Sequence, residues 1–139
     1  MMTRDVISIE LTSRLGAALQ LLREHDIRHL PVVAEGELRG ILSDRDIRTY
    51  RPPEPLVDDN VVASIELLDT PLWRVMTAEV LTASPEESID RALDLFVDRR
   101  VGAICVVEDG LLVGIVSYID ALRALRDERR ATGSSHPPG

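Results

Sequence analysis

An internal repeat constrains this chain more than any single motif. Gly40, Ser43 and Asp46 form a Gly-x-x-Ser-x-x-Asp pattern that returns 74 residues later (114 − 40 = 74) as Gly114, Ser117 and Asp120. The same offset aligns further pairs without a gap: Met2-Thr3 with Met76-Thr77, Ala18-Leu19 with Ala92-Leu93, Val32-Val33 with Val106-Val107, and Gly36 with Gly110. Self-similarity at a fixed period indicates two copies of one structural unit.

The composition limits the class of protein. With 139 residues, 45% of them hydrophobic and 29% charged, the sequence predicts a globular protein with a core of moderate size. It shows no apolar run of the roughly 18 residues that a membrane span needs and no signal-peptide layout, so we expect a cytoplasmic protein without a membrane partner. The lone Cys105 is expected to be a small buried residue. A net charge of −8 disfavours nucleic acid, because phosphate-binding proteins carry basic faces.

Apolar spacing predicts the same order of elements in the first copy as in the second. Residues 6–9 are expected to form an edge strand, and Thr12-Ser13 to cap a helix. Two strands, 30–33 and 38–42, follow around a tight turn at 35–37, and Ser43 opens a second helix. The apolar stripe of the first helix is Leu15, Ala18, Leu19 and Leu22.

The second copy carries clearer signals. Ser84-Pro85-Glu86-Glu87 predicts a capping box with proline at the first helical position. Strands are expected at 103–107 and 111–116, followed by a helix from Ser117 to about Asp127. The predicted buried side chains of the two helices are Ile89, Ala92, Leu93 and Phe96, then Ala121, Leu122 and Leu125.

The two copies predict the domain boundaries. We expect repeat 1 at 1–50, a connector at 51–74, repeat 2 at 75–127 and a disordered tail at 128–139. The connector begins with a Pro-rich stretch (52–55), and a short helix bearing Val61, Ile65 and Leu68 on one face follows. Thr70-Pro71 then opens a turn in which Trp73 is expected to be a buried anchor, with a dimer contact as the alternative. A lone strand-helix-strand-strand-helix copy buries little surface, so two copies are expected to pack together.

The repeated motif has two interpretations. Ser followed three residues later by an acid is a helix cap, in which the hydroxyl satisfies a free N–H group and the carboxylate favours the helix start. The same geometry also suits a ligand, because a helix start attracts phosphate and a carboxylate one turn later accepts both hydroxyls of a ribose. A pattern present twice at one offset favours a nucleotide site more than a single copy does.

The sequence resembles the cystathionine-β-synthase (CBS) domain pair, also called a Bateman module. The resemblance rests on the two Met-Thr openings, on the run from Ile27 to Val33, and on the two Gly-x-x-Ser-x-x-Asp stretches, and it spans roughly residues 2–126. It implies an α/β (α+β) fold of two β-α-β-β-α repeats about a pseudo-two-fold axis. It also implies clefts for adenosine-containing ligands and frequent homodimers. The family's ribose-binding acid falls on Asp46 and Asp120, its hydroxyl residue on Ser43 and Ser117, and its adenine contacts on Val6, Ile7, Val80 and Leu81.

The two copies differ in charge. The resemblance places phosphate contacts at Arg28 and His29, with Arg45 next to Asp46, whereas the second copy has Gly102-Ala103 and Ile119 at those positions. We therefore expect the Asp46 cleft to take AMP, ADP or ATP. The Asp120 cleft is expected to be weaker, empty or specific for a less charged adenosyl ligand. Arg99-Arg100 either supplies charge to that cleft or forms a solvated helix end.

The sequence favours a regulatory protein over an enzyme. It shows no nucleophile-base pair and no paired acid and base, and its three histidines lack metal-ligand spacing. We expect no required cofactor. An adenosine nucleotide would act as the regulatory ligand, with NAD and S-adenosylmethionine as further candidates, and an effector protein would read the bound state. The alternative is a ligand-free structural or oligomerisation module in which both motifs serve only as helix caps.

Overall fold

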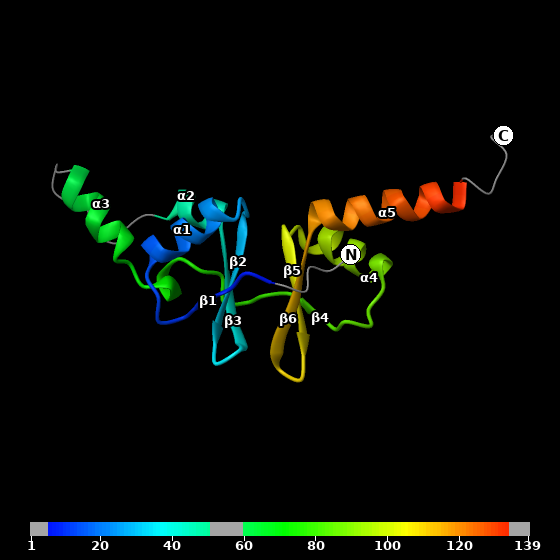
Figure 1. The fold of residues 1–139 in the computed structure, drawn as a ribbon, viewed down its shortest axis with the longest axis horizontal. Coiled ribbons are helices and arrows are strands. Elements are labelled where there is room, and N and C mark those ends of the chain that lie inside the picture. Colours follow the sequence, from blue (N-terminus) through cyan, green and yellow to red (C-terminus); the bar gives the residue numbers. More distant parts are fainter. Residues whose placement is uncertain (1–5, 51–59, 134–139) are drawn as a thin grey trace. The chain divides into compact units, whose positions relative to one another are not determined.

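A computed structural model describes residues 6–50 and 60–133, which fall into two compact units (Figure 1). The first unit is Ile7–Val80, and the second consists of Val6 with residues 81–133. The boundary predicted at residue 75 does not coincide with this division. Residues 75–80 belong to the first unit, because Thr77 pairs with Ile41 through two main-chain hydrogen bonds of 2.8 and 2.9 Å.

The first unit is a three-stranded sheet with helices beside it. Strand β1 runs parallel to β2, and β2 pairs antiparallel with β3. The elements are β1 (Ile9–Glu10), α1 (Leu15–Glu24), β2 (His29–Ala34), β3 (Glu37–Ser43), α2 (Asp44–Thr49), α3 (Asn60–Leu68) and the 3-10 turn η1 (Leu72–Arg74). The edge strand predicted at 6–9 is therefore shorter and starts later, because β1 consists only of Ile9 and Glu10.

The second unit repeats this arrangement with the same register. Its elements are β4 (Thr82–Ala83), α4 (Ile89–Arg99), β5 (Ala103–Glu108), β6 (Leu111–Ser117) and α5 (Tyr118–Gly133). Val32 opposes Gly40 in the first hairpin and Val106 opposes Gly114 in the second, and each hairpin has a register shift directly after that pair. The duplication seen in the sequence is therefore a duplication of strand pairing, which confirms the mixed α+β fold of two repeats.

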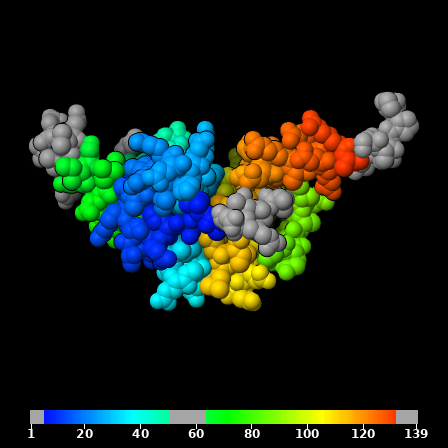
Figure 2. All heavy atoms as spheres, viewed as in Figure 1, coloured from blue at the N-terminus to red at the C-terminus, as the bar shows by residue number. Residues whose placement is uncertain are grey.

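The turns repeat as well. The residues with positive φ are Asp26, Glu35 and Gly36, and their counterparts at the 74-residue offset are Arg100, Asp109 and Gly110. Two consecutive residues with positive φ make the tight hairpin turn that matches the twist of the flanking strands, so the predicted turns are confirmed. Both turns lie at the molecular surface (Figure 2), at the end of each hairpin opposite its helices (Figure 1).

Each unit has its own hydrophobic core. In the first unit, Leu15, Ala18 and Leu22 of α1 pack with the strands and with Leu72 and Val75. In the second, Ala92 and Phe96 of α4 pack with the strands and with Ala121 of α5. Cys105 is fully buried, as predicted, and burial raises the pKa of its thiol to about 12.

Two helix starts differ from the prediction. Helix α1 begins after Arg14, not after Thr12-Ser13, and it has no side-chain cap. Helix α4 begins after Ser88, whose hydroxyl accepts a hydrogen bond from the Arg91 N–H group, so the helix start predicted at Ser84 is wrong. One bond of the predicted capping box is nevertheless present, because the Ser84 N–H group donates to Glu87 Oε1 at 3.4 Å. Residues 84–87 instead form a turn that follows β4, closed by a bond from the Glu87 N–H group to the Ser84 carbonyl.

The connector and the last helix also differ from the prediction. Trp73 is 61% exposed, with the Arg74 guanidinium 5.2 Å from its ring centre, while the adjacent Leu72 is the buried anchor. Ile65 and Leu68 of α3 are exposed. Helix α5 continues to Gly133 rather than ending near Asp127, and Leu122 on it is exposed. The Pro-rich stretch at 52–55 and residues 134–139 lie outside the described residues.

Gly40 allows residues 76–77 to pack against β3. A Cβ atom at this position would lie 2.8 Å from the Met76 sulfur and 2.9 Å from the Thr77 carbonyl oxygen. The methionine can move, but the Thr77 carbonyl is held by its hydrogen bond from Ile41. The repeated glycine therefore has a steric role in the first unit.

We predict that Gly40→Ala lowers the free energy of unfolding by about 1–3 kcal/mol, the usual cost of forcing extra volume into a packed site. Urea denaturation measures the change. The control is Arg39→Ala on the same strand, which removes an exposed side chain and is expected to cost no more than roughly 0.5 kcal/mol. Equal stability of Gly40→Ala and wild type would show that residues 76–77 do not pack on β3.

Candidate functional site

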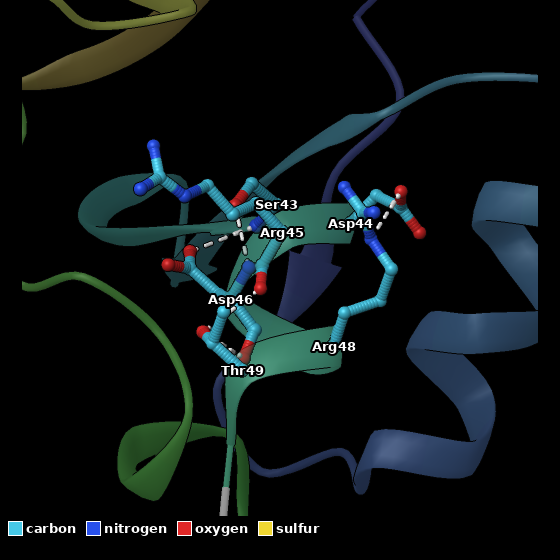
Figure 3. Close-up of polar contacts among 6 residues, drawn as sticks. All are labelled: Ser43, Asp44, Arg45, Asp46, Arg48 and Thr49. Atoms are coloured by element: carbon cyan, nitrogen blue, oxygen red, sulfur yellow. Dashed lines mark hydrogen bonds and ion pairs between the residues drawn. The ribbon is translucent and has the colours of Figure 1, made fainter.

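The first repeated motif forms a reciprocal helix cap where β3 meets α2 (Figure 3). The Asp46 N–H group donates to the Ser43 hydroxyl at 2.9 Å, and the Ser43 N–H group donates to Asp46 Oδ2 at 3.0 Å. Ser43 keeps an extended backbone while Asp46 occupies the third helical position, the arrangement of a capping box. The cap interpretation of the motif is therefore correct. It uses one of the two carboxylate oxygens of Asp46.

The strand register brings two basic residues to this junction. His29 begins β2 directly opposite Ser43, and the Asp44 N–H group donates to the Arg28 carbonyl at 3.0 Å. Arg28 is exposed and His29 is half-buried. Residues that are about 15 positions apart in the sequence thus meet at the open end of the hairpin.

His29 is electrostatically coupled to the other charges at the junction. Burial lowers the pKa of its imidazole, and the Arg28 charge lowers it further, while the Asp46 carboxylate opposes both effects. Because the net shift is downward from 6.5, the ring is neutral at pH 7. The positive charge available to an anion at neutral pH comes from arginine, not from His29.

The two sides of α2 have different roles (Figure 3). On one side Asp44 and Arg48 form an ion pair of 3.1 Å, while Arg45 and Asp46 lie on the other side. Within the described part of the chain, neither Arg28 nor Arg45 has an ion-pair partner. The junction therefore presents a half-engaged carboxylate together with two arginines that are not neutralised by a neighbouring acid.

The second junction has the same hydrogen bonds but lacks the cations. The Asp120 N–H group donates to the Ser117 hydroxyl at 3.1 Å, and the Ser117 N–H group donates to Asp120 Oδ2 at 3.4 Å. The Tyr118 N–H group donates to the Gly102 carbonyl at 2.9 Å, in the place of the bond between Asp44 and Arg28. Ala103 replaces His29 opposite the serine.

Tyr118 packs against the neighbouring helix. Its ring lies edge-on to Phe96 of α4, with 5.9 Å between the ring centres, although 46% of the residue is exposed. Ile119, the counterpart of Arg45, is 51% exposed. Arg99 and Arg100 are both exposed at the end of α4, where Arg100 has a left-handed backbone.

The predicted adenine contacts are the residues next to the two points in the sequence at which the chain passes from one unit to the other. Ile7 and Val80 belong to the first unit, and Val6 and Leu81 to the second; all four are half-buried. The Leu81 carbonyl is engaged in the sheet, where it accepts the Cys105 N–H group at 3.2 Å. A contact of these four residues with adenine stays a prediction.

Thr77 lies near the first junction, a position that the sequence did not predict. Its backbone pairs with Ile41, two residues before Ser43, and its side chain is exposed. The signal available in the sequence was the Met-Thr pair, which is repeated at the same 74-residue offset as the Ser-Asp motif.

Among the described residues no cluster of His, Cys, Asp and Glu suits a metal ion. Residues 6–50 and 60–133 also contain no helix with the length and apolarity of a membrane span.

Each unit contains a hairpin whose second strand leads into a helix through a Ser-Asp cap, so the protein is a duplicated α+β module. Comparison with known proteins identifies its family. The family model for the CBS domain matches residues 1–52 and 72–127. The chain therefore belongs to the CBS domain family, as the resemblance in its sequence predicted. The two matched regions overlap the repeats predicted at 1–50 and 75–127, although residues 72–80 of the second region lie in the first compact unit.

Similar proteins include whole proteins of comparable length. The CBS domain-containing protein YhcV of Bacillus subtilis is 29% identical over 119 residues, covering 86% of this chain and 78% of that protein. Other curated relatives are longer, and the chain spans 42%, 44% and 53% of three of them.

Solved structures share the fold along nearly the whole chain. A Vibrio cholerae structure described as an acetoin utilization protein (AcuB) is 28% identical, with a TM-score of 0.79 over 99% of this chain and 95% of that one. The CBS domain pair of protein MJ0100, crystallised with 5′-methylthioadenosine and S-adenosylmethionine, is 25% identical, with a TM-score of 0.70 over 89% of this chain and 94% of that one.

We predict that the pKa of His29 in the folded, ligand-free protein lies below 6.5, because burial disfavours the charged ring. The unfolded chain then binds protons more readily, so His29 contributes stability that is complete above pH 6.5 and is lost as the pH falls below that value. Histidine NMR signals followed by pH titration measure the pKa.

The Asp46 carboxylate supplies the internal check on this prediction. Because it raises the pKa of His29, Asp46→Asn is expected to lower that pKa further, whereas Asp44→Asn, on the other side of α2, leaves it nearly unchanged. A His29 pKa above 6.5 in the wild-type protein would contradict the described junction.

Proposed function

We propose that this protein is a regulatory module that binds an adenosine nucleotide at the Asp46 junction. The observation that carries the proposal is the combination of the half-engaged Asp46 carboxylate with Arg28 and Arg45 at one strand-helix junction. A carboxylate oxygen accepts ribose hydroxyls, and guanidinium groups bind phosphate oxygens with paired N–H donors. AMP, ADP and ATP contain both groups.

The relatives support an adenosine ligand in general terms. Both ligands in the MJ0100 structure contain adenosine, and the TM-score of 0.70 places this chain in the same fold. Neither of those ligands carries a phosphate. The phosphate preference proposed here therefore rests on Arg28 and Arg45 of this chain and not on the relative.

The two junctions are proposed to differ in their ligands. The Asp120 junction repeats the ribose-accepting geometry but has Gly102, Ala103 and Ile119 where the first has Arg28, His29 and Arg45. A phosphorylated ligand therefore gains less binding energy from charge interactions at the Asp120 junction. The second junction is either weaker for nucleotides or selective for a less charged adenosyl compound such as S-adenosylmethionine.

Regulation follows if the ligand binds one arrangement of the protein better than another. A ligand shifts a conformational equilibrium only by its difference in affinity for the two states. We propose that a second protein reads the ligand-bound state and that the module acts as a homodimer in the cytoplasm. No catalytic role is proposed for any residue of the two junctions.

A structural role without a ligand is the second candidate. It is favoured by the cap bonds themselves, because Ser43, Asp46, Ser117 and Asp120 all make hydrogen bonds that stabilise helix starts. Under this candidate the protein is an oligomerisation module and no adenosine compound binds. The two candidates make opposite predictions for ligand-dependent stability.

We predict that AMP, ADP or ATP raises the melting temperature of the wild-type protein. A ligand present at 100 times its Kd stabilises the folded state by about 2.7 kcal/mol, which corresponds to several degrees for a chain of this size. The Asp46→Asn variant keeps an acceptor for the Ser43 N–H group and removes the charge, so we expect a normal fold with a much smaller shift. Asp44→Asn is the matched control and should respond like wild type.

The 2′-deoxy form of the best nucleotide separates ribose recognition from phosphate recognition. It is expected to give a smaller shift with wild type and little further loss with Asp46→Asn. The absence of any ligand-dependent shift across AMP, ADP, ATP, NAD and S-adenosylmethionine would favour the structural candidate.

We further predict that AMP or ATP affinity, measured by calorimetry, falls at least tenfold in Asp46→Asn and less than threefold in Asp120→Asn. The difference between the two variants is expected because the second junction lacks the cations. A tenfold change corresponds to about 1.4 kcal/mol, close to the lower end of what one hydrogen bond to a charged group contributes. The reverse order of the two variants would refute the proposed ranking.

A further inference from the structure

The imidazole of His29 is half-buried at the first junction, but it makes no hydrogen bond or ion pair with any residue in the ranges 6–50 and 60–133. These ranges also contain no buried side-chain nitrogen or oxygen without a partner, so the ring nitrogens of His29 are not sealed from solvent. An imidazole nitrogen without a partner can accept a proton or donate an N–H group to an added ligand. His29 is therefore a side chain whose protonation a bound ligand can change.

The strand register holds His29 at the junction. It lies directly opposite Ser43, the last residue of β3, and the carbonyl of the preceding Arg28 accepts the Asp44 N–H group at 3.0 Å. The second unit has the same register, but there Ala103 lies opposite Ser117. A side chain that titrates near neutral pH is therefore present at this position in only one of the two junctions.

The charged groups around the imidazole come from the start of β2 and from α2. Burial and the positive charge of Arg28 disfavour the protonated ring, whereas the Asp46 carboxylate favours it. Arg45 lies on the same side of α2 as Asp46, while Asp44 and Arg48 form an ion pair with each other on the other side (Figure 3). The cationic form of the ring is thus opposed by arginine charge that an anion would neutralise.

We propose that His29 takes up a proton when a phosphorylated nucleotide binds at the Asp46 junction, so that nucleotide affinity rises as the pH falls from about 8 to about 6.5. This inference rests on the proposed function and adds a proton-linked regulation to it. A phosphate group carries a charge of about −1.5 to −2 near pH 7. When Arg28 binds it, the phosphate offsets the arginine charge that disfavours the protonated ring and adds negative charge that favours it.

The direction of the pH dependence follows from the two protonation states. In the ligand-free protein the pKa of His29 lies below 6.5, so the ring is neutral at pH 7. In the complex the phosphate raises this pKa, and between the two values the complex binds more protons than the free protein. Lowering the pH within that window therefore strengthens binding, by at most about tenfold for each unit of increase in the pKa. Adenosine lacks the phosphate and is expected to bind without this gain.

Proton uptake is measured directly by calorimetry of AMP binding at about pH 7, in two buffers with different ionisation enthalpies. We expect the wild-type protein to take up more protons than His29→Gln, which binds the same ligand with a side chain that does not titrate. NMR titration of the histidine rings provides the second measurement. The signal that disappears in His29→Gln is expected to show a higher pKa with AMP than without it, and no such increase with adenosine.

The pH dependence of AMP affinity distinguishes His29 from other titrating groups, including the phosphate itself. Wild type is expected to bind about threefold or more tightly at pH 6.5 than at pH 8, and His29→Gln is expected to lose this gain while binding like wild type at pH 8. His25→Gln is the matched control, because it removes an exposed histidine at the end of α1 and should keep the gain.

The outcomes separate this inference from the proposed function. AMP binding with equal proton uptake in wild type and His29→Gln, or a gain at low pH that persists in His29→Gln, would overturn the proton linkage and leave nucleotide binding in place. An equal increase of the His29 pKa with adenosine would also overturn it, because the phosphate would not be the cause. The absence of AMP binding at both pH values would overturn the proposed function together with this inference.

Discussion

The junction at which a hairpin strand becomes a helix determines how the rest of each unit is arranged. Ser43 is the last residue of β3 and the N-cap of α2, so its hydrogen bonds with Asp46 define the direction in which the chain leaves the sheet. The bond from the Asp44 N–H group to the Arg28 carbonyl ties the same point to the neighbouring strand. Because the second unit repeats these bonds at Ser117 and Gly102, the two junctions differ mainly in side chains rather than in backbone.

A carboxylate can serve as a cap and as a ligand contact at the same time. The cap occupies one oxygen of Asp46 and holds the side chain in place, which reduces the entropy that a ligand contact would otherwise cost. The cap and binding interpretations of the motif are therefore compatible. What distinguishes the two junctions is the surrounding charge, since Arg28 and Arg45 have uncharged counterparts in the second unit.

The two cores are also unequal, for a reason that lies in the connector. Leu72 completes the first core because its segment pairs with the start of α1. The second core has Ala83 and Val116 where the first has the larger Ile9 and Leu42, and a small hollow lies beside them. The strand register is nevertheless the same in both units, so the difference lies in the side chains and not in the pairing of the strands.

The sequence by itself determined the duplication, both hairpins and their turns, because these depend on local spacing and on residues such as Gly36 that adopt positive φ. It also identified Ser43-Asp46 and Ser117-Asp120 as paired residues, since a cap is formed within one turn. Only the tertiary structure decided where α1 and α4 begin, because a helix starts where its apolar stripe meets the sheet, not at the first available cap residue such as Ser84.

The other differences between the predicted and the observed structure also arise from packing between residues distant in the sequence. Leu72 and Trp73 are adjacent apolar residues with no local signal to tell them apart, and only packing against α1 and the strands buries the first and exposes the second. The meeting of Arg28 and His29 with Asp46 depends on strand register, which links residues distant in sequence. Local chemistry therefore determined which residues act as pairs, and long-range pairing decided which pairs share one site.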